Sequence, residues 1–397
     1  MKRRPLAHLC FLAVVLPSVT PAQTLGSGAV IQIPHPWAQR NHDPRRTAQS
    51  DYRGPTTGEV VWKTLQPGTV PQFAVSNRGN ISLNDVWNPA WWSEEDYLTV
   101  LNARGEVMLH KKVQSFPWGF SQSVQSSGGF DNANNLVLPT SNGDVVKTSL
   151  VGDTQWLVHG SSNSTNDSSI AIMPNGDVYG FQFLVGLFKI RADGTVVFSG
   201  AAGGATPAIA PNGDIATGAV RSNEPHTFPA VYYDNPNGAN RWIFKTTNGG
   251  GSIPVFGPDG TLYIGVDNLG LYAFNPDGSI KWTNATATWR SSLAFGKNGV
   301  LYVGNSNGVA AVNPSNGAVV WSTQIPDSLR SGIALDSRGL IFTTSSTGRI
   351  YGLNPDGTFA LNAQVCDNFL TGPVIATQGR AIACGKVGFD TFVFAIQ

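Results

Sequence analysis

The sequence predicts an all-β fold: one eight-bladed β-propeller of four-stranded antiparallel blades, whose last blade is closed by an N-terminal strand. The composition and an eightfold repeat predict it. The chain has 397 residues, of which 41% are hydrophobic and only 13% charged, with 45 Gly and 25 Pro. Low charge argues against disorder. Many Gly and Pro between short apolar runs are typical of strands joined by tight turns.

The first mark of the repeat is a turn whose last residue suits a left-handed backbone. Such residues occur at eight places: Gly79, Asn134, Gly176, Gly213, Gly260, Gly299, Gly339 and Gly379. The last five intervals are 37, 47, 39, 40 and 40 residues. Intervals of this length are typical of propeller blades.

The second mark is a Gly followed four residues later by a bulky residue, which we expect to pack between blades. Seven pairs follow the blades in order: Gly105–Leu109, Gly152–Trp156, Gly194–Phe198, Gly238–Trp242, Gly278–Trp282, Gly317–Trp321 and Gly357–Leu361. The eighth pair, Gly58–Trp62, stands near the N-terminus instead of the C-terminus. We therefore expect residues 58–64 to supply the outer strand of the last blade, which ties the two ends of the ring together.

The N-terminus predicts export. A basic start at residues 2–4 precedes an apolar run at residues 6–16, and the pattern of a signal peptide ends at residue 22. The arginine pair in the basic start leaves a twin-arginine signal open as an alternative. We expect a secreted or periplasmic protein in which residues 1–22 are a signal peptide, residues 23–57 form an N-terminal segment and residues 58–397 form the propeller.

The charge of the chain excludes some partners. Removal of the three basic residues of the signal changes the formal net charge from +1 to −2. This balance gives no electrostatic case for nucleic acid. No later apolar run reaches the length of about 20 residues that a membrane-spanning helix needs. We therefore expect no nucleic-acid partner and no membrane span. We also expect a monomer.

Two cysteines remain after the signal, Cys366 and Cys384. Their even number and short spacing permit a disulfide in an oxidising compartment. Two buried free thiols in adjacent strands fit the sequence equally well. Both alternatives stay open.

The stretch Ala-Phe-Asn-Pro-Asp-Gly-x-x-x-Trp at residues 273–282 resembles the tryptophan-docking repeat of pyrroloquinoline-quinone-like propellers. Residues 42–47, followed by Gly54 and Pro55, resemble the start of secreted members, and the resemblance extends over residues 35–397. The family includes quinoprotein alcohol dehydrogenases and a propeller lipoprotein of outer-membrane assembly, which is a scaffold without cofactor. The resemblance implies the fold more than an activity.

The dehydrogenases of that family use an adjacent cysteine pair against the quinone. Cys366 and Cys384 are far apart in the sequence, and the chain has no haem-attachment motif. We therefore expect no cofactor, and a quinone-dependent dehydrogenase is the least favoured function.

A functional site is expected at the channel mouth, where the loops entering the innermost strands meet. Most residues there are small, but Asp167, Arg290 and Arg330 are predicted to point into the mouth. They fit a binding site or an ion-pair cluster that neutralises itself.

Tryptophans are concentrated in loops predicted on the same face. Residues 84–97 are expected to form a long loop with Trp87, Trp91 and Trp92, while Trp118 and Trp289 lie in neighbouring connections. Trp beside charged groups suits sugars, peptides or amphipathic small molecules. The alternative is that these rings pack the loops onto the propeller.

Catalytic candidates are few. Glu94 and Glu95 provide carboxylates for glycoside or lyase chemistry, and His226 is a possible base or metal ligand. A run of acidic residues is also typical of a solvated loop, and one His with one Glu does not define a metal site.

The sequence favours an exported binding or scaffold module that uses its loop-rich face without a quinone cofactor. Its expected ligand there is a small molecule, a saccharide or a protein. The alternative is a secreted lyase or hydrolase acting on a saccharide or small organic substrate at the channel mouth, with Arg290, Arg330, Glu94, Glu95 and His226 as catalytic candidates.

Overall fold

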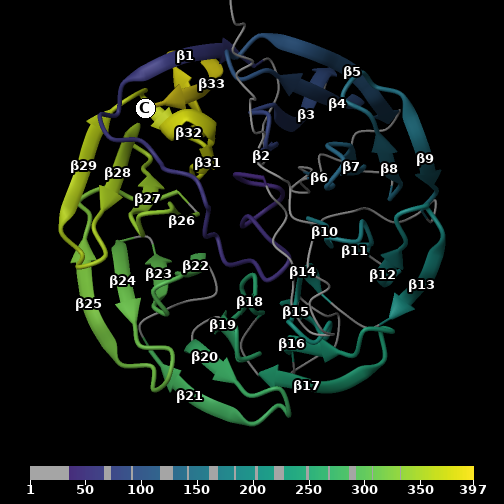
Figure 1. The fold of residues 1–397 in the computed structure, drawn as a ribbon, viewed down its shortest axis with the longest axis vertical. Helices are drawn as coiled ribbons and strands as arrows, with labels where there is room; N and C mark the ends of the chain where they lie inside the picture. Colours follow the sequence, from purple (N-terminus) through teal and green to yellow (C-terminus); the bar gives the residue numbers. More distant parts are fainter. Residues whose placement is uncertain are drawn as a thin grey trace, which may run out of the picture.

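A computed structural model describes residues 35–66, 73–90, 93–116, 128–140, 143–160, 169–182, 185–201, 204–218, 228–246, 250–266, 269–285, 292–305, 307–330 and 332–397. These residues form eight antiparallel sheets arranged as blades around a central axis (Figure 1). The predicted eight-bladed propeller is therefore confirmed. No helix in this part of the chain is long and apolar enough to cross a bilayer.

The strands of each blade follow one another from the axis to the rim. Blade 1 contains β2 (Phe73–Val75), β3 (Ile81–Ala90), β4 (Ser93–Leu101) and β5 (Val107–Phe116). Blade 2 contains β6 (Gly129–Phe130), β7 (Leu136–Pro139), β8 (Val145–Thr148) and β9 (Thr154–Val158). Blade 3 contains β10 (Ala171–Ile172), β11 (Val178–Gln182), β12 (Gly186–Ile190) and β13 (Val196–Ala201). Blade 4 contains β14 (Ala205–Ile209), β15 (Ile215–Gly218), β16 (Phe228–Asp234) and β17 (Asn240–Thr246).

The second half of the ring repeats this order. Blade 5 contains β18 (Val255–Phe256), β19 (Leu262–Val266), β20 (Gly270–Phe274) and β21 (Ile280–Asn284). Blade 6 contains β22 (Ser292–Phe295), β23 (Leu301–Asn305), β24 (Gly308–Val312) and β25 (Val319–Gln324). Blade 7 contains β26 (Ala334–Leu335), β27 (Ile341–Thr344), β28 (Arg349–Leu353) and β29 (Phe359–Gln364). Blade 8 contains β30 (Asn368–Phe369), β31 (Val374–Ala376), the 3₁₀ turn η1 (Thr377–Gly379), β32 (Arg380–Val387) and β33 (Asp390–Ile396).

The outer strand of blade 8 comes from the other end of the chain. β1 (Val60–Leu65) pairs antiparallel with β33, and Trp62 lies opposite Ala395. The indole N–H of Trp62 then donates to the Ala103 carbonyl of blade 1 at 3.1 Å. The predicted closure by the N-terminal strand is confirmed.

The same indole bond joins other neighbouring blades. The indole N–H of Trp156, Trp242, Trp282 and Trp321 donates to the carbonyl of Ala192, Pro276, Pro314 and Pro355, respectively, at 2.8–3.0 Å. Gly105 shows why the residue against which each ring packs is a Gly. Its φ is +81°, and a Cβ there would lie 2.5 Å from the Trp62 ring. The bulky residues of the repeat therefore pack between blades, as predicted.

The propeller has two unlike faces. The turns between first and second strands and between third and fourth strands form one, which we call the turn face. The connections between second and third strands and from each fourth strand to the next blade form the other, the loop-rich face. All eight first-turn residues identified in the sequence have positive φ, from 64° at Asn134 to 86° at Gly213.

The N-terminal segment follows a path that the sequence did not reveal. Residues 35–54, which we call the plug, run through the central channel (the purple coil at the centre of Figure 1). The plug meets the innermost strands in blade order, near their turn-face ends. The backbone N–H groups of Val75, Phe130, Ile209, Phe256, Phe295 and Leu335 donate to the carbonyls of Trp37, Ala38, Pro44, Arg45, Thr47 and Ala48, respectively.

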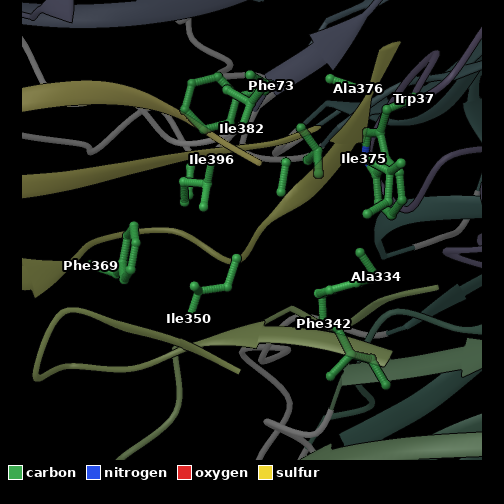
Figure 2. Close-up of a cluster of buried hydrophobic side chains, with 14 of the residues drawn as sticks. Trp37, Phe73, Ala334, Phe342, Ile350, Phe369, Ile375, Ala376, Ile382 and Ile396 are labelled. Carbon is green, nitrogen blue, oxygen red and sulfur yellow. The ribbon is translucent and has the colours of Figure 1, made fainter. Parts of the chain in front are cut away.

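Side chains hold the plug at the remaining positions. Gln39 replaces the backbone at blade 3, where its side-chain amide bonds both the N–H and the carbonyl of Ile172. Trp37 is only 3% exposed and packs into the main apolar cluster beside Ile375 and Ala376 (Figure 2). The channel is therefore filled at its turn-face end.

Candidate functional site

Seven of the predicted site residues lie outside the described residues: Trp91, Trp92, Trp118, Asp167, His226, Trp289 and Arg290. Their roles stay predictions. The proposed ion-pair cluster of Asp167, Arg290 and Arg330 is untested for the same reason.

The loop predicted at residues 84–97 is largely a β-ribbon instead. β3 and β4 continue through it, with Trp87 paired to Glu95 and Ala90 to Ser93. Glu94 is the strand position next to Glu95 and pairs with Phe116 of β5. The turn-forming residues in this stretch suggested a loop, but pairing between strands overrides such local preferences.

Arg330 lies in the connection from blade 6 to blade 7, on the loop-rich face. Its Nε donates to the Phe369 carbonyl at 2.7 Å and its Nη2 to Oδ1 of Asn368 at 2.9 Å. Both acceptors are neutral, and Arg330 takes part in none of the ion pairs found among the described residues. The nearby Asp327 carboxylate accepts instead from the Tyr351 hydroxyl. The guanidinium is thus held in place while its charge remains uncompensated within the described residues.

A hollow lies in the channel above the plug, next to Arg330. Its cavity volume is about 60 Å³, and the empty space reaches about 460 Å³ only when the open solvent around its mouth is counted. Its lining residues are Trp37, Asn41, Phe73, Gly332, Ile333, Leu370, Thr371, Gly372, Pro373 and Val374. Trp37 and Asn41 belong to the plug, and the others belong to the channel-facing ends of blades 1, 7 and 8. The hollow is therefore a recess whose floor is the plug.

The plug residues of this floor were missed in the sequence. Asn41 and His42 have positive φ values of 51° and 72°, and a hydrogen bond from the His42 N–H to the Gln39 carbonyl closes the turn. Positive φ is uncommon outside Gly, but Asn and His are among the residues that adopt it more often. In the sequence, residues 42–47 show only a family resemblance, and no side-chain pattern there indicates a recess.

Buried charges fix the plug below the floor. Asp43 is 2% exposed, and it accepts from the Thr47 hydroxyl at 2.5 Å and from the Thr47 N–H at 3.1 Å. Burial opposes ionisation of Asp43, but the neighbouring His42 and Arg45 and the Thr47 bonds hold the pKa of its carboxyl below the ordinary value. The carboxylate therefore stays ionised and acts as a structural acceptor in this segment.

The two cysteines are buried free thiols, Cys384 in β32 of blade 8 and Cys366 in the connection that leads from blade 7 to blade 8. Burial raises the pKa of Cys366 to about 11 and that of Cys384 to about 12. Thiols of that kind are unreactive at neutral pH. The disulfide alternative stays a prediction for an oxidising compartment. Among the described residues, no group of three His, Cys, Asp or Glu side chains is arranged to hold a metal ion.

Comparison with known proteins shows which proteins have a similar sequence repeat and a similar fold. The family model described as "Outer membrane protein assembly factor BamB" matches residues 305–386. The crystal structure of BamB from Moraxella catarrhalis is similar with a TM-score of 0.58 and 15% identity, covering 85% of this chain and 97% of that chain. The chain is a PQQ-like repeat β-propeller. No curated protein sequence matches it.

Two other solved structures have a fold similar to that of this chain. The quinohemoprotein alcohol dehydrogenase from Comamonas testosteroni has a TM-score of 0.59 and 10% identity, covering 92% of this chain and 81% of that chain. The C-terminal WD40 domain of Sif2 has a TM-score of 0.60 and 9% identity, covering 86% of this chain and 99% of that chain. At these identities the likeness concerns the fold alone.

Proposed function

We propose that this propeller is an exported binding or scaffold module that engages its ligand through the loop-rich face. One observation carries the proposal: the plug fills the channel at the turn face, so the recess above it is reached from the loop-rich face. A rigid ring with a recess that opens to one face is suited to holding a partner or small ligand.

The comparisons support a binding role without naming a ligand. The similar BamB structure belongs to a protein described as an assembly factor, and proteins of this architecture carry many unrelated functions. The signal-like segment at residues 1–22 supports a secreted or periplasmic location. In this proposal the protein acts as a monomer and needs no quinone cofactor.

Photo-crosslinking tests which face is used. A photoreactive amino acid is introduced singly at exposed positions of the loop-rich face, Ser328, Thr347 and Phe389, and at exposed turn-face positions, Arg104, Asp193 and Asp356. Irradiation is carried out in the compartment to which the chain is exported, and each adduct is identified and then reconstituted with the purified components. The proposal expects specific adducts from the loop-rich face only.

Two results would contradict this function. Adducts confined to the turn face would show that the wrong face was assigned. Conversion of a saccharide or small organic substrate by the purified chain, abolished by Arg330→Ala, would replace the scaffold with the secreted-enzyme alternative.

A further inference from the structure

A histidine ring fastens the start of the plug to the turn face. His35 is 1% exposed and bridges the first turns of blades 1 and 2. The backbone N–H of Asn77 donates to its Nδ1 at 2.8 Å, and its Nε2 lies 3.0 Å from the Asp131 carbonyl oxygen. The imidazole also packs beside the Phe130 ring, with 5.9 Å between the ring centroids. One side chain of the plug therefore holds two neighbouring blades.

The two bonds require a neutral imidazole in one tautomer. A backbone N–H only donates, so Nδ1 must keep its lone pair, and a carbonyl only accepts, so Nε2 must carry the proton. Protonation of the ring places a second hydrogen on Nδ1, which then faces the N–H of Asn77 and loses that bond. The closed arrangement of His35 therefore holds the neutral ring and excludes the imidazolium.

The carboxylate of Asp131 is occupied by other partners. It accepts from the backbone N–H groups of Ala133 and Asn135 at 2.8–2.9 Å. It also forms an ion pair with Lys147 at 2.8 Å. The carboxylate is thus committed to its own turn and to a lysine, and it is the backbone carbonyl of Asp131 that bonds the His35 ring.

The other charged groups around the ring do not favour its protonation. His42 of the plug and Lys147 of β8 are bases, and Arg78 is a cation at the surface of the blade 1 turn. Burial lowers the pKa of His35 below its ordinary value, and the contacts with Asp131 oppose this shift without cancelling it. Because the folded-state pKa is the lower one, this bridge stabilises the fold fully above the unfolded pKa of about 6.5, and its contribution is lost as the pH falls below that value.

The same turn N–H meets the plug in two other blades. The residues equivalent to Asn77 are Lys297 in blade 6 and Ser337 in blade 7, each two positions before the turn Gly. The Lys297 N–H donates to the side-chain carbonyl of Gln49 at 3.2 Å, and the Ser337 N–H donates to the Tyr52 carbonyl at 2.9 Å. Amide oxygens do not titrate near neutral pH, so blade 1 differs from blades 6 and 7 in having an acceptor that does.

We propose that His35 is an acid-sensitive latch between the plug and blades 1 and 2. At neutral pH the uncharged ring holds both turns. Below about pH 6.5 the open form gains a proton that the closed form does not accommodate, so the start of the plug is released. The pairing of Trp37 with Val75 keeps the rest of the plug in the channel. This inference goes beyond the proposed function, because it concerns the turn face and needs no ligand.

Amide hydrogen exchange of the purified mature chain measures the latch directly. The protection factor of the Asn77 amide, which is its intrinsic exchange rate divided by its observed rate, is compared by NMR at about pH 7.5 and about pH 5. We expect it to fall at least about five-fold at the lower pH, because an open form with a pKa of about 6.5 is then almost fully protonated. The amides of Lys297 and Ser337 are internal controls and should keep their protection.

Two substitutions separate the latch from a general effect of acid. His35→Gln replaces the ring with an amide that both accepts and donates, as Gln49 does at blades 6 and 7, but does not titrate. The Asn77 amide of this variant should stay protected at both pH values. His159→Gln is the matched control, because the His159 side chain is 77% exposed, and this variant should keep the wild-type pH dependence.

Three results would overturn the inference. The first is equal protection of the wild-type Asn77 amide at the two pH values. The second is an equal loss at Lys297 and Ser337, which would show that the whole plug loosens through another group. The third is an unchanged pH dependence in a folded His35→Gln variant. If that variant does not fold, the wild-type comparison with its two internal controls decides alone. The crosslinking test of the loop-rich face is independent of all these results.

Discussion

Arg46 is the residue on which the plug depends most. It is fully buried, and its guanidinium donates to three backbone carbonyls at 2.7–2.8 Å: Pro207 of blade 4, Ile170 at the start of blade 3, and Arg40 of the plug itself. A planar guanidinium has enough donors to satisfy three acceptors at once. One side chain thus fastens the segment to two blades.

Arg46→Leu is expected to lower the free energy of unfolding by about 3 kcal/mol or more, because each buried carbonyl left without a donor costs about 1–3 kcal/mol. Urea denaturation measures the change. Arg53→Leu, at an exposed position just before the end of the plug, serves as the control and should change stability by less than about 0.5 kcal/mol. Equal effects of the two substitutions would argue that Arg46 is not buried in the channel.

Asp234 gives the molecule a predicted pH dependence. Its side chain is buried, Oδ1 accepts from Asn240, and Oδ2 has no hydrogen-bond partner in the part of the chain that the structure describes. Burial raises the pKa of this carboxyl to about 6. Because the folded-state pKa lies above the unfolded value of about 3.9, the folded state holds the proton more tightly. The contribution of Asp234 to the free energy of unfolding is therefore most favourable below about pH 4, and it is lost as the pH rises through 6.

Asp234→Asn should remove this pH-dependent loss of stability. It should raise the free energy of unfolding at pH 7 by about 1–3 kcal/mol, which is the free energy that corresponds to the raised pKa of Asp234. Denaturation curves between pH 4 and pH 8 measure it. Asp153→Asn, at an exposed turn, is the control. A variant that keeps the wild-type pH dependence over this range would contradict the assignment to Asp234.

At the scale of elements, the joint between β1 and β33 decides whether the ring is closed. Leu65 lies opposite Phe392 across this joint. Cysteines introduced at both positions, in a chain with Cys366→Ala and Cys384→Ala, should form an intramolecular disulfide under mild oxidation, because directly opposed strand residues lie close enough for one.

Peptide mapping after proteolysis measures that crosslink. Leu65→Cys combined with Val320→Cys, on the outer strand of blade 6, is the matched control and should stay unlinked. Efficient linking of the control pair, or none of the opposed pair, would place β1 elsewhere.

This joint and the blades were predictable because their signals are local. The turn Gly residues need positive φ, and each bulky residue four positions later packs against the next blade, so both leave a mark in the sequence. The ribbon of β3 and β4 was missed because Asn84, Asp85, Asn88 and Pro89 are turn-forming residues, whereas strand pairing through Trp87 and Glu95 is a contact between distant positions.

At the scale of the whole molecule, the plug unites the ring. It hydrogen-bonds to blades 1 to 7 in order, Trp37 packs against blade 8, and the chain after the plug joins blade 8 as β1. Most of these contacts are made by backbone carbonyls. Because every residue has a backbone carbonyl, no side-chain pattern in the sequence indicates these contacts. That is why the sequence predicted the ring but not the floor of the recess formed by Trp37 and Asn41.

Native-state hydrogen exchange tests the central claim, that the plug occupies the central channel. The informative amides are those that donate to the plug: Val75, Phe130, Ile209, Phe256, Phe295 and Leu335. They are expected to exchange only through global unfolding, as slowly as amides within the interior strands. Exchange of these amides as fast as the solvent-facing amides of the outer strand β25 would contradict the account, because it would mean that the channel holds no plug.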